Sequence, residues 1–437
     1  MRNCPSIRWR IFIFSGLLAL LGDPNALAHE TPTPADEANS GTILSLAPIS
    51  PNDFQGSDSE RIQQAVDAAT KTGQVVVIPR LNQTSDGERA IWMLDSAILV
   101  PSNTTLILVN CHLKLSDQCR DNVIRSANCG LEITEVEPLE NITIQGIGRA
   151  VLEGADHPRA TGDSGKTLGK QSYGTDAGKL GESPTGDWRN IGILLAHVDG
   201  FRIENIHLKD SHAWAISLER CAQGVIRDVS FDSTGHKTIA GKQEPILNQD
   251  GIDLRQGCHD ILIENISGRT GDDLIALTTI LGKSREPGGT NSTMVTPANN
   301  RGDGQDDIRH ITIRNVRGFS VGDHIVRFLN NGGLKIHDVI LDGVVDTSKD
   351  EPIKAAVKIG DTNYGGLAPP GDTARLMISN VMSRAEHTLL IAGPLSDSSI
   401  SNVIRHGRPG DAITLGSGSE SLENVSIENV RPLEQAP

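Results

Sequence analysis

The chain has 437 residues, of which 22% are charged and only 3% are aromatic, and its formal net charge is −15. This length is typical of two or three domains, although long β folds can form a single one. The acidic surplus argues against a nucleic-acid partner, because such partners are bound by clustered Lys and Arg. The scarcity of aromatic residues disfavours folds organised around aromatic motifs and predicts an aliphatic core.

Residues 1–28 have the organisation of a secretory signal peptide. A basic start is followed by an apolar run from Ile11 to Leu21 and by the small-x-small sequence Ala26-Leu27-Ala28. The apolar run is too short for a stable transmembrane helix, and no later segment is long and apolar enough to span a membrane. We therefore expect a secreted or periplasmic protein that is monomeric and has no membrane attachment once the signal is removed.

The next segments predict an arm and a helix. Residues 29–50 are rich in Pro and polar residues and predict a linker or extended arm. Within residues 57–72, apolar side chains recur at helical spacing, and a β-branched run follows at residues 75–79. A helix placed before the first strand can cover the open end of a sheet or solenoid, where unpaired strand edges would invite aggregation.

A short motif, Ile-x-Asn/Asp-Ile/Val, recurs along the rest of the chain. Its eight copies begin at Ile203, Ile226, Ile263, Ile313, Ile336, Ile378, Ile400 and Ile427, and Ile144-Gln145-Gly146-Ile147 is a degenerate earlier copy. The basic step between copies is 22 to 27 residues, and longer steps contain inserted loops. Repeats of this length are typical of a solenoid.

We interpret the repeat as a single-stranded right-handed parallel β-helix over residues 51–437, with an N-terminal capping helix. Each unit contains short β-branched strands that alternate with period two and are broken by Gly, Asn and Asp. The repeated apolar positions are Ile and Val, whereas leucine-rich repeats would require Leu. The repeated Asn or Asp is expected at a turn, because its side chain bonds backbone groups and tolerates the left-handed conformation.

Two long polar inserts, Asp156–Asn190 and Lys283–Asp307, are candidate walls of a cleft, since inserts in a solenoid cluster on one face. Five cysteines follow the signal peptide, and their spacing fits no zinc motif. We expect buried small hydrophobic residues, with a Cys119–Cys129 bridge as the alternative, and the sequence indicates no metal and no cofactor.

Two acidic stretches, Asn248–Asp253 and Gly271–Ala276, carry the candidate chemistry. Asp250 and Asp273 are 23 residues apart, which is one repeat, so they should stand above one another with Asp272 beside them. Three carboxylates this close cannot all ionise freely, so one should hold a proton near neutrality. A carboxylic acid beside a carboxylate suits general acid–base catalysis. Turn formation by Asp-Gly and a calcium site remain open alternatives at this point.

The stretches Asn248-Gln249-Asp250-Gly251-Ile252-Asp253 and Gly271-Asp272-Asp273 resemble the two carboxylate motifs of glycoside hydrolase family 28, the polygalacturonase-like enzymes. Their order, their separation by one coil and the surrounding Ile-x-Asn-Ile repeats are all similar. Residues 59–79 also resemble the start of many pectinase-type β-helices. The resemblance covers most of residues 50–430 in architecture and is sharp over Asn248–Leu277.

The resemblance implies a role for each carboxylate. Asp272 would be the general acid, and Asp250 and Asp273 would activate the attacking water, with inversion at the anomeric carbon. Inverting enzymes usually separate their carboxyl groups by about 6.5–9.5 Å, whereas neighbouring coils lie about 4.8 Å apart. Splayed side chains, or a different azimuth for Asp272, would supply the difference.

The histidine motif departs from the family pattern. The family's Gly-His-Gly corresponds to Gly322-Asp323-His324, because the 50-residue step between neighbouring repeats carries Asp273 to Asp323. Asp323 is therefore expected in the histidine's column, and a shift of one residue would place His324 there instead. The alternative for His324 is an exposed or hydrogen-bonded turn histidine.

The basic motif departs as well. The family's Arg-Ile-Lys corresponds to Lys358-Ile359-Gly360, which keeps only the first cation. The resemblance implies that these cations hold the substrate carboxylate, and Arg327 is a candidate replacement for the lost one. The candidate substrate-binding residues are Asp323, His324, Arg327 and Lys358, although ordinary solvated charges would explain the two cations equally well.

The leading hypothesis is a secreted, metal-independent glycoside hydrolase acting on a plant or algal polysaccharide or its oligosaccharides. One alternative on the same fold is a uronate lyase or epimerase, which typically needs Ca²⁺ or a Lys or Arg base. Another is a non-catalytic glycan-binding solenoid with a degenerate site, which the altered downstream motifs favour. The loss of a cation, together with the acidic charge, argues against polygalacturonate as the substrate.

Overall fold

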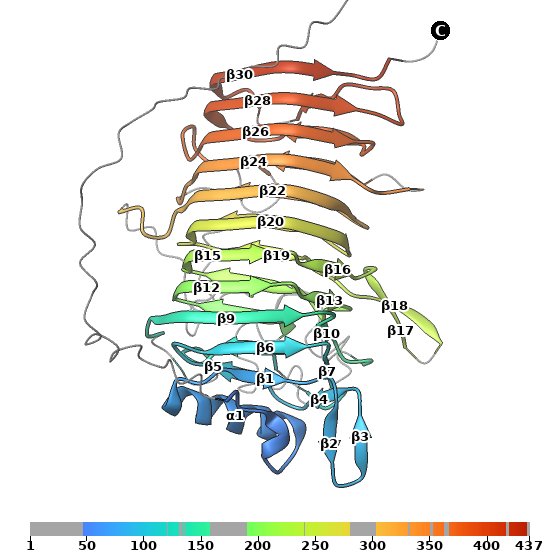
Figure 1. Cartoon of the computed structure of the whole chain (residues 1–437). Coiled ribbons are helices and arrows are strands. Elements are labelled where there is room, and N and C mark those ends of the chain that lie inside the picture. Colours follow the sequence, from blue (N-terminus) through green and yellow to red (C-terminus); the bar gives the residue numbers. More distant parts are fainter. Residues whose placement is uncertain are drawn as a thin grey trace, which may run out of the picture. The chain divides into compact units, whose positions relative to one another are not determined.

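Residues 47–434 wind into a parallel β-helix (Figure 1). Ala47–Pro437 form one compact unit. The predicted signal peptide, most of the predicted linker and most of both inserts lie outside the described residues. The computed structural model describes residues 47–119, 121–130, 133, 136–157, 190–239, 241–279, 303–330, 333–349, 353–361, 367–416 and 419–434.

The larger of the two parallel sheets contains sixteen strands in the part of the chain described. Consecutive coils pair in parallel, so each coil contributes to the same sheets as the one before it. The strands of this sheet are β1 (Val76–Ile78), β4 (Trp92–Leu94), β6 (Thr105–Val109), β7 (His112–Leu115), β9 (Leu139–Ile147), β10 (Val151–Glu153), β12 (Val198–Glu204), β13 (His207–Lys209), β15 (Ala222–Arg227), β16 (Ser230–Asp232), β20 (His259–Thr270), β22 (Ile308–Ser320), β24 (Ile336–Asp346), β26 (Thr373–Ser383), β28 (Leu395–Arg405) and β30 (Leu422–Arg431).

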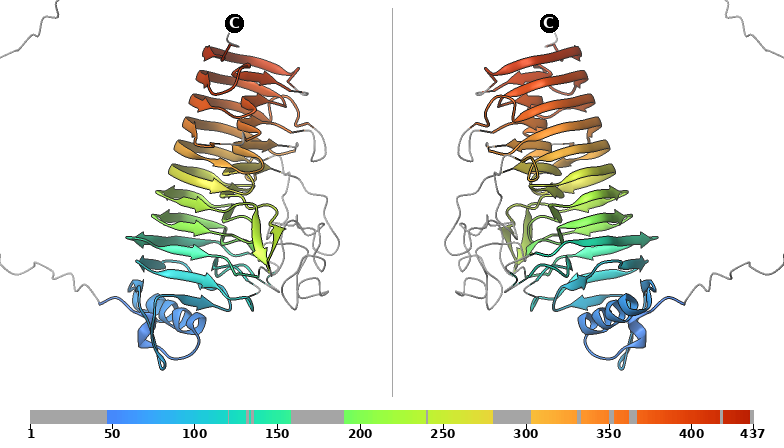
Figure 2. Two further views of the ribbon diagram at one scale, coloured as in Figure 1. Left: turned by 90° about the vertical axis from the view of Figure 1, so that its right-hand side faces the viewer. Right: turned by 90° about the vertical axis from the view of Figure 1, so that its left-hand side faces the viewer.

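The second parallel sheet has ten strands among the described residues, and it carries the candidate site. Two short antiparallel hairpins, β2–β3 and β17–β18, extend from the coils; the second projects from the side of the β-helix next to β16 (Figures 1 and 2). The strands of this sheet are β5 (Ile98–Val100), β8 (Ile124–Ser126), β11 (Ile193–Ala196), β14 (Ile216–Glu219), β19 (Ile252–Leu254), β21 (Ile275–Thr279), β23 (His324–Asn330), β25 (Ala355–Ile359), β27 (His387–Ile391) and β29 (Ile413–Leu415), and the hairpin strands are β2 (Asn82–Thr84), β3 (Gly87–Arg89), β17 (His236–Ile239) and β18 (Lys242–Pro245).

A single α-helix among the described residues, α1 (Asp58–Thr72), covers the N-terminal end of the β-helix. A short 3-10 helix, η1 (Pro51–Asp53), precedes it. Ser57 and Glu60 form a capping box at the start of α1, and Gly73 ends this helix in the left-handed conformation. Its apolar face packs on β1, β4 and β5. The predicted capping helix is confirmed; no helix of the described residues is long and apolar enough to cross a membrane.

The interior is filled by stacked aliphatic columns. In the longest column, ten members are at most 1% exposed, and the eleventh, on the last coil, is 42% exposed. Burial of one such side chain contributes about 1.5–3 kcal/mol, so this column explains how the chain folds with few aromatic residues. Its members are Val76, Leu106, Ile144, Ile203, Ile226, Ile263, Ile313, Leu341, Ile378, Ile400 and Ile427.

The Asn or Asp of all eight motif copies has a positive φ, between 50° and 58°. The predicted turn role is therefore confirmed. Several of these side chains also bond to one another from coil to coil: the amide of Asn315 donates to Asn265 Oδ1 at 2.6 Å, and that of Asn265 donates to Asp228 Oδ1 at 2.9 Å. Asn402 donates to Asn380 in the same way, at 2.9 Å. We call this column of stacked turn residues, which includes Asp228, Asn265, Asn315, Asn380 and Asn402, the asparagine ladder.

One motif copy was assigned to the wrong column. In the pairing of β22 with β24, Ile313 lies opposite Leu341 and Val316 opposite Val344, so Gly343 stands in the ladder where Asp338 was expected. The Ile336 copy instead aligns with Ile308, at a second turn whose His310 and Asp338 also have positive φ. Both turns place a left-handed residue between aliphatic neighbours, so the motif does not distinguish them.

The five cysteines after the signal peptide are all buried and unbridged. Four of them, all but Cys129, lie in the main aliphatic core. Burial raises the pKa of Cys111 and Cys258 to about 12, which keeps both as neutral thiols. They act as small hydrophobic residues, as expected, and the alternative of a Cys119–Cys129 bridge is wrong.

Candidate active site

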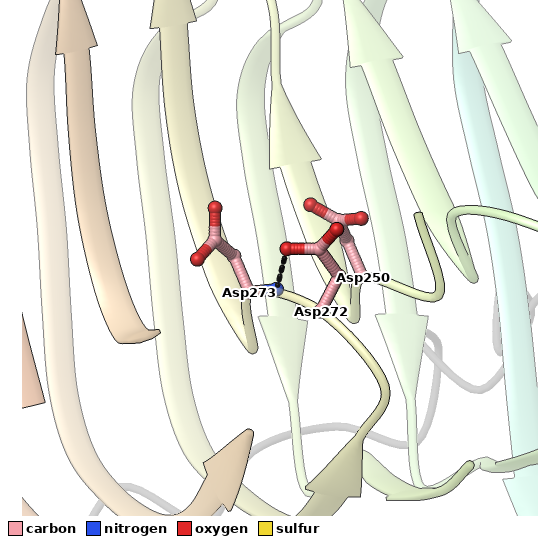
Figure 3. Close-up of side chains that lie close together, drawn as sticks. All are labelled: Asp250, Asp272 and Asp273. Atoms are coloured by element: carbon pink, nitrogen blue, oxygen red, sulfur yellow. Dashed lines mark hydrogen bonds between the residues drawn. The ribbon is translucent and has the colours of Figure 1, made fainter. Parts of the chain in front are cut away.

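The three candidate carboxylates converge at one edge of the second sheet. Asp250 lies two residues before β19, and Asp272 and Asp273 lie just before β21, on the next coil. The Gly251 amide donates to the Asp273 carbonyl at 2.9 Å, which fixes the two coils in register. One oxygen of each carboxylate lies within 4.8 Å of one from each of the others (Figure 3). The expected stacking is present, but the expected splay of these oxygens is not.

Gln249 holds this edge together. Its carbonyl accepts hydrogen bonds from the amides of Gly271 and Asp272, at 3.1 and 3.2 Å. Its side chain accepts from the Gly235 amide at 2.8 Å and donates to the Ser211 carbonyl at 2.6 Å. A Cβ at Gly271 would lie 2.7 Å from the Cα of Gly235, so only glycine permits this approach.

Asp273 is held as an anion. His324 Nδ1 donates to Asp273 Oδ1 at 2.7 Å, and the His324 amide donates to the same oxygen at 3.1 Å. Arg327 Nη1 donates to Asp273 Oδ2 at 3.1 Å. Burial alone would raise the pKa of Asp273, but Arg327 and His324 outweigh it and lower that pKa to about 2.

Asp272, in contrast, tends to keep its proton. Burial, the charge of Asp273 and the neighbouring Asp323 raise the pKa of Asp272 to about 8. Its own side chain accepts the Asp273 amide at 3.0 Å, drawn as the dashed line in Figure 3. At neutral pH, Asp272 is therefore a carboxylic acid beside an ionised Asp273, the pairing that assigns acid and base roles in carboxylate enzymes.

Two further carboxyl groups share the site. Burial raises the pKa of Asp250 and of Asp253, and the nearby carboxylates add to the effect in both. Asp250 is 6% exposed, and its Oδ1 has no hydrogen-bond partner among the described residues; the same holds for Asp253 Oδ2. A buried oxygen without a donor is costly and points to a ligand or water that would supply one.

The histidine register differs from the expectation. Thr270 pairs with Ser320, an offset of 50, but in the second sheet Ile275 pairs with Val326, an offset of 51. The same register places His324, rather than Asp323, opposite Asp273. The assignment of Asp323 to that column is wrong, because one extra residue lies between Ser320 and β23. His324 is 3% exposed and bound to Asp273, so it is not an exposed turn residue.

The two predicted cations are paired within the protein. Arg327 and Lys358 lie opposite one another on β23 and β25. Arg327 Nη2 donates to Asp361 Oδ2 at 2.6 Å, and Lys358 Nζ donates to the same oxygen at 2.7 Å. Asp323, the fourth predicted binding residue, accepts from Lys354 Nζ at 2.5 Å. Neither cation is an ordinary solvated surface charge.

Sequence reasoning missed three groups. Asp253 stands in the same column as Ala276, Arg327 and Lys358. This position can be predicted only when the register of the strands is known. Asp361 directly follows Lys358-Ile359-Gly360, so the signal was an acid immediately after the basic motif. Lys354 had no signal, because its contact with Asp323 spans 31 residues.

The carboxylate cluster is a poor calcium site. Its three carboxylates offer the oxygen donors that Ca²⁺ prefers, but this ion takes six to eight oxygen ligands. Both oxygens of Asp273 already accept hydrogen bonds from His324 and Arg327. Asp272 keeps its proton near neutrality, which removes a second anionic ligand. The donor set therefore favours proton transfer over metal binding.

Fold and site define a parallel β-helix with convergent carboxylates on one outer edge. Residues 97–283 match the family model of Glycosyl hydrolases family 28, and the chain therefore carries a domain of this family. The matched range contains Asp250, Asp272 and Asp273, and it ends before His324 and Lys358. No curated protein matches the sequence.

Several solved structures are similar to this chain at low sequence identity. The endo-xylogalacturonan hydrolase from Aspergillus tubingensis is 12% identical, with a TM-score of 0.51, over 88% of this chain and 93% of its own. A family 28 exopolygalacturonase from Yersinia enterocolitica is 13% identical, with a TM-score of 0.44, over 89% of this chain and 80% of its own. The Streptococcus pneumoniae surface adhesin PfbA is 14% identical, with a TM-score of 0.38, over 89% and 93%. The first of these confirms the β-helix.

Proposed function

We propose that the protein is a glycoside hydrolase in which Asp272 is the general acid. The observation that carries the proposal is the split between neighbouring carboxyl groups, because the pKa of Asp272 is raised to about 8 while that of Asp273 is lowered to about 2. Family 28 membership of residues 97–283 supports this reaction class and a polysaccharide substrate of the pectic type. The Aspergillus protein of the same fold is an endo-xylogalacturonan hydrolase, which is consistent with this substrate class.

The reaction follows from these protonation states. Asp272 gives its proton to the glycosidic oxygen as the bond from that oxygen to the anomeric carbon breaks. The positive charge that develops on the sugar is stabilised by the Asp273 carboxylate. Water attacks the anomeric carbon and gives one proton to a carboxylate. Asp250 in its ionised form suits this role better than Asp273, because its Oδ1 has no hydrogen-bond donor among the described residues, whereas both oxygens of Asp273 already accept hydrogen bonds.

The stereochemical outcome is open to a direct test. The family resemblance implies inversion, whereas the separation within 4.8 Å is shorter than the about 6.5–9.5 Å usual for inverting enzymes. We propose inversion, with the water held at the Asp250 side of the cluster. Proton NMR of the first product formed distinguishes the anomers before they equilibrate, and an initial product of retained configuration would contradict this part of the proposal.

A uronate lyase on the same fold is less well supported. Such an enzyme typically needs Ca²⁺ or a Lys or Arg base at the substrate. Arg327 and Lys358 both donate to Asp361, so both side chains are engaged by a carboxylate of the protein rather than placed to take a proton from a substrate. A lyase would release an unsaturated product that absorbs in the ultraviolet, so the absence of that signal during reducing-end release would separate the two reactions.

The test of the proposal is reducing-end release from a panel of plant and algal glycans. We expect Asp272→Asn and Asp273→Asn to lose about 10²- to 10⁴-fold in rate, because the first removes the general acid and the second removes the carboxylate that stabilises the developing positive charge. Asp199→Asn is the matched control, since it removes one exposed charge on β12, in the other sheet. Full activity of both site variants would contradict the proposal.

We also propose that the protein is exported. The support is the sequence of residues 1–28, with its apolar run and small-x-small end. N-terminal sequencing of the protein recovered from the medium or periplasm should begin at His29. A cell-associated protein that retains Met1 would contradict export.

A further inference from the structure

One carboxylate, Asp361, binds both cations on the far side of Asp273. Arg327 Nη2 and Lys358 Nζ donate to the same oxygen, Asp361 Oδ2, at 2.6 and 2.7 Å. Asp361 is 2% exposed, and Arg327 is 8% exposed. A buried acceptor shared by two cations neutralises much of their charge, and separating it from them would leave buried charges uncompensated.

The other described cations near the cluster also face carboxylates. Lys354 donates to Asp323 at 2.5 Å. Arg255 is 3% exposed, lies 5.9 Å over the Trp214 ring and acts on the charge of Asp253. Arg327 is further committed to Asp273 at 3.1 Å. In the described part of the site, every one of these side chains therefore already has an anionic neighbour.

Carboxyl groups outnumber the cations here. Six of them face this region among the described residues: Asp250, Asp253, Asp272, Asp273, Asp323 and Asp361. A substrate carboxylate placed against Arg327 and Lys358 would lie beside Asp273 and Asp361, and it would have to displace Asp361 from a buried ion pair. Like charges at such distances are strongly unfavourable, and an unpaired charge of this kind is a standard means of rejecting one ligand in favour of another.

We propose that the glycosyl unit bound beside Arg327 and Lys358 is uncharged, and that Asp361 sets this preference by neutralising both cations. The substrate class is therefore a glycan with a neutral residue at this position, such as an esterified or carboxyl-free sugar. The reaction on that glycan rests on the proposed hydrolase function, but the binding preference does not.

The test compares two forms of one ligand. Galacturonan oligosaccharides with free carboxylates and the same oligosaccharides as methyl esters differ in charge while keeping sugar and linkage. For the wild type we expect kcat/KM to be at least tenfold higher on the esters. In Asp361→Asn, kcat/KM on the charged substrate divided by kcat/KM on the ester should rise at least tenfold, because Arg327 and Lys358 then have no shared anion. Asp199→Asn, with the same loss of charge on β12, should keep the wild-type ratio.

A binding measurement separates this inference from the proposed reaction. Calorimetric titration of Asp272→Asn with both oligosaccharides reports the preference without turnover, and it also decides the matter if Asp361→Asn does not fold. Tighter binding of the ester supports the inference, even where the wild type hydrolyses neither ligand and the hydrolase proposal fails. Equal or tighter binding of the charged form, or binding of neither form, would overturn it.

Discussion

The asparagine ladder and the carboxylate cluster are both columns of polar side chains repeated from coil to coil, yet their chemistry is opposite. In the ladder, an amide of one coil donates to an oxygen of the coil before it, as Asn315 does to Asn265. In the cluster, Asp250 and Asp273 occupy successive coils, and the buried Asp250 Oδ1 finds no donor among the described residues.

The ladder and the cluster differ in the hydrogen-bond donors that their side chains carry. An amide carries both a donor and an acceptor, so a column of Asn satisfies itself, whereas ionised carboxylates only accept. The cluster must therefore keep protons, as Asp272 does, or recruit cations, as Asp273 recruits Arg327. The ladder adds stability to a repeat, and the cluster holds reactive groups at the expense of stability.

The largest effect on stability is expected at Asp273. Asp273→Ala removes the anion that pairs with Arg327 and His324, and breaking a buried ion pair costs about 3–5 kcal/mol. Urea denaturation followed by circular dichroism measures the loss. Asp273→Asn keeps one of the two acceptor oxygens and should lose less; a loss below about 1 kcal/mol for the alanine variant would contradict the ion-pair account.

The pH dependence of activity should follow Asp272. A general acid must be protonated, so kcat/KM should fall about tenfold per pH unit once the pH exceeds about 8, the raised pKa of Asp272. Asp273, with its pKa lowered to about 2, stays ionised over the same range and adds no limb above that value. A pH–rate profile from pH 4 to 10 measures this. An alkaline fall centred near pH 4 to 5 would show that the acid has an ordinary carboxyl pKa.

A smaller effect is expected in the ladder. Asn315 has a φ of 54° and bonds to Asn265, so Asn315→Ala should cost about 1–2 kcal/mol through backbone strain and the lost hydrogen bond. Asn315→Gly relieves the strain and should cost less. Urea denaturation checks both variants, and activity on the best glycan should stay at the wild-type level. Loss of activity without loss of stability would show that the ladder is not purely structural.

The β-helix could be predicted because the sequence patterns that indicate it are local. The Ile-x-Asn-Ile motif, the helical spacing in residues 57–72 and the stacking of Asp250 on Asp273 each depend on neighbours or on a single repeat. The Ile336 copy was misplaced because two turns use the same local geometry. A motif of four residues contains no information on which of two equivalent turns it forms.

The site was predicted less completely. Asp250, Asp272 and Asp273 converge as expected, whereas the position of His324 depends on one extra residue between Ser320 and β23, which changes the offset from 50 to 51. Such a shift is set by turn geometry that composition and spacing do not reveal. The contacts of Asp361 with Arg327 and Lys358 required side-chain positions, because any of several nearby acids could have bound the same cations.

The central claim is that neighbouring carboxyl groups are split into an acid and an anion. Carbon-13 NMR of protein labelled at Asp side chains, assigned with Asp272→Asn and Asp273→Asn, measures both titrations directly. The predicted result is one carboxyl group that titrates near pH 8 and is lost in Asp272→Asn, and another that remains ionised down to about pH 2. Titration of both groups near pH 4 would contradict the account.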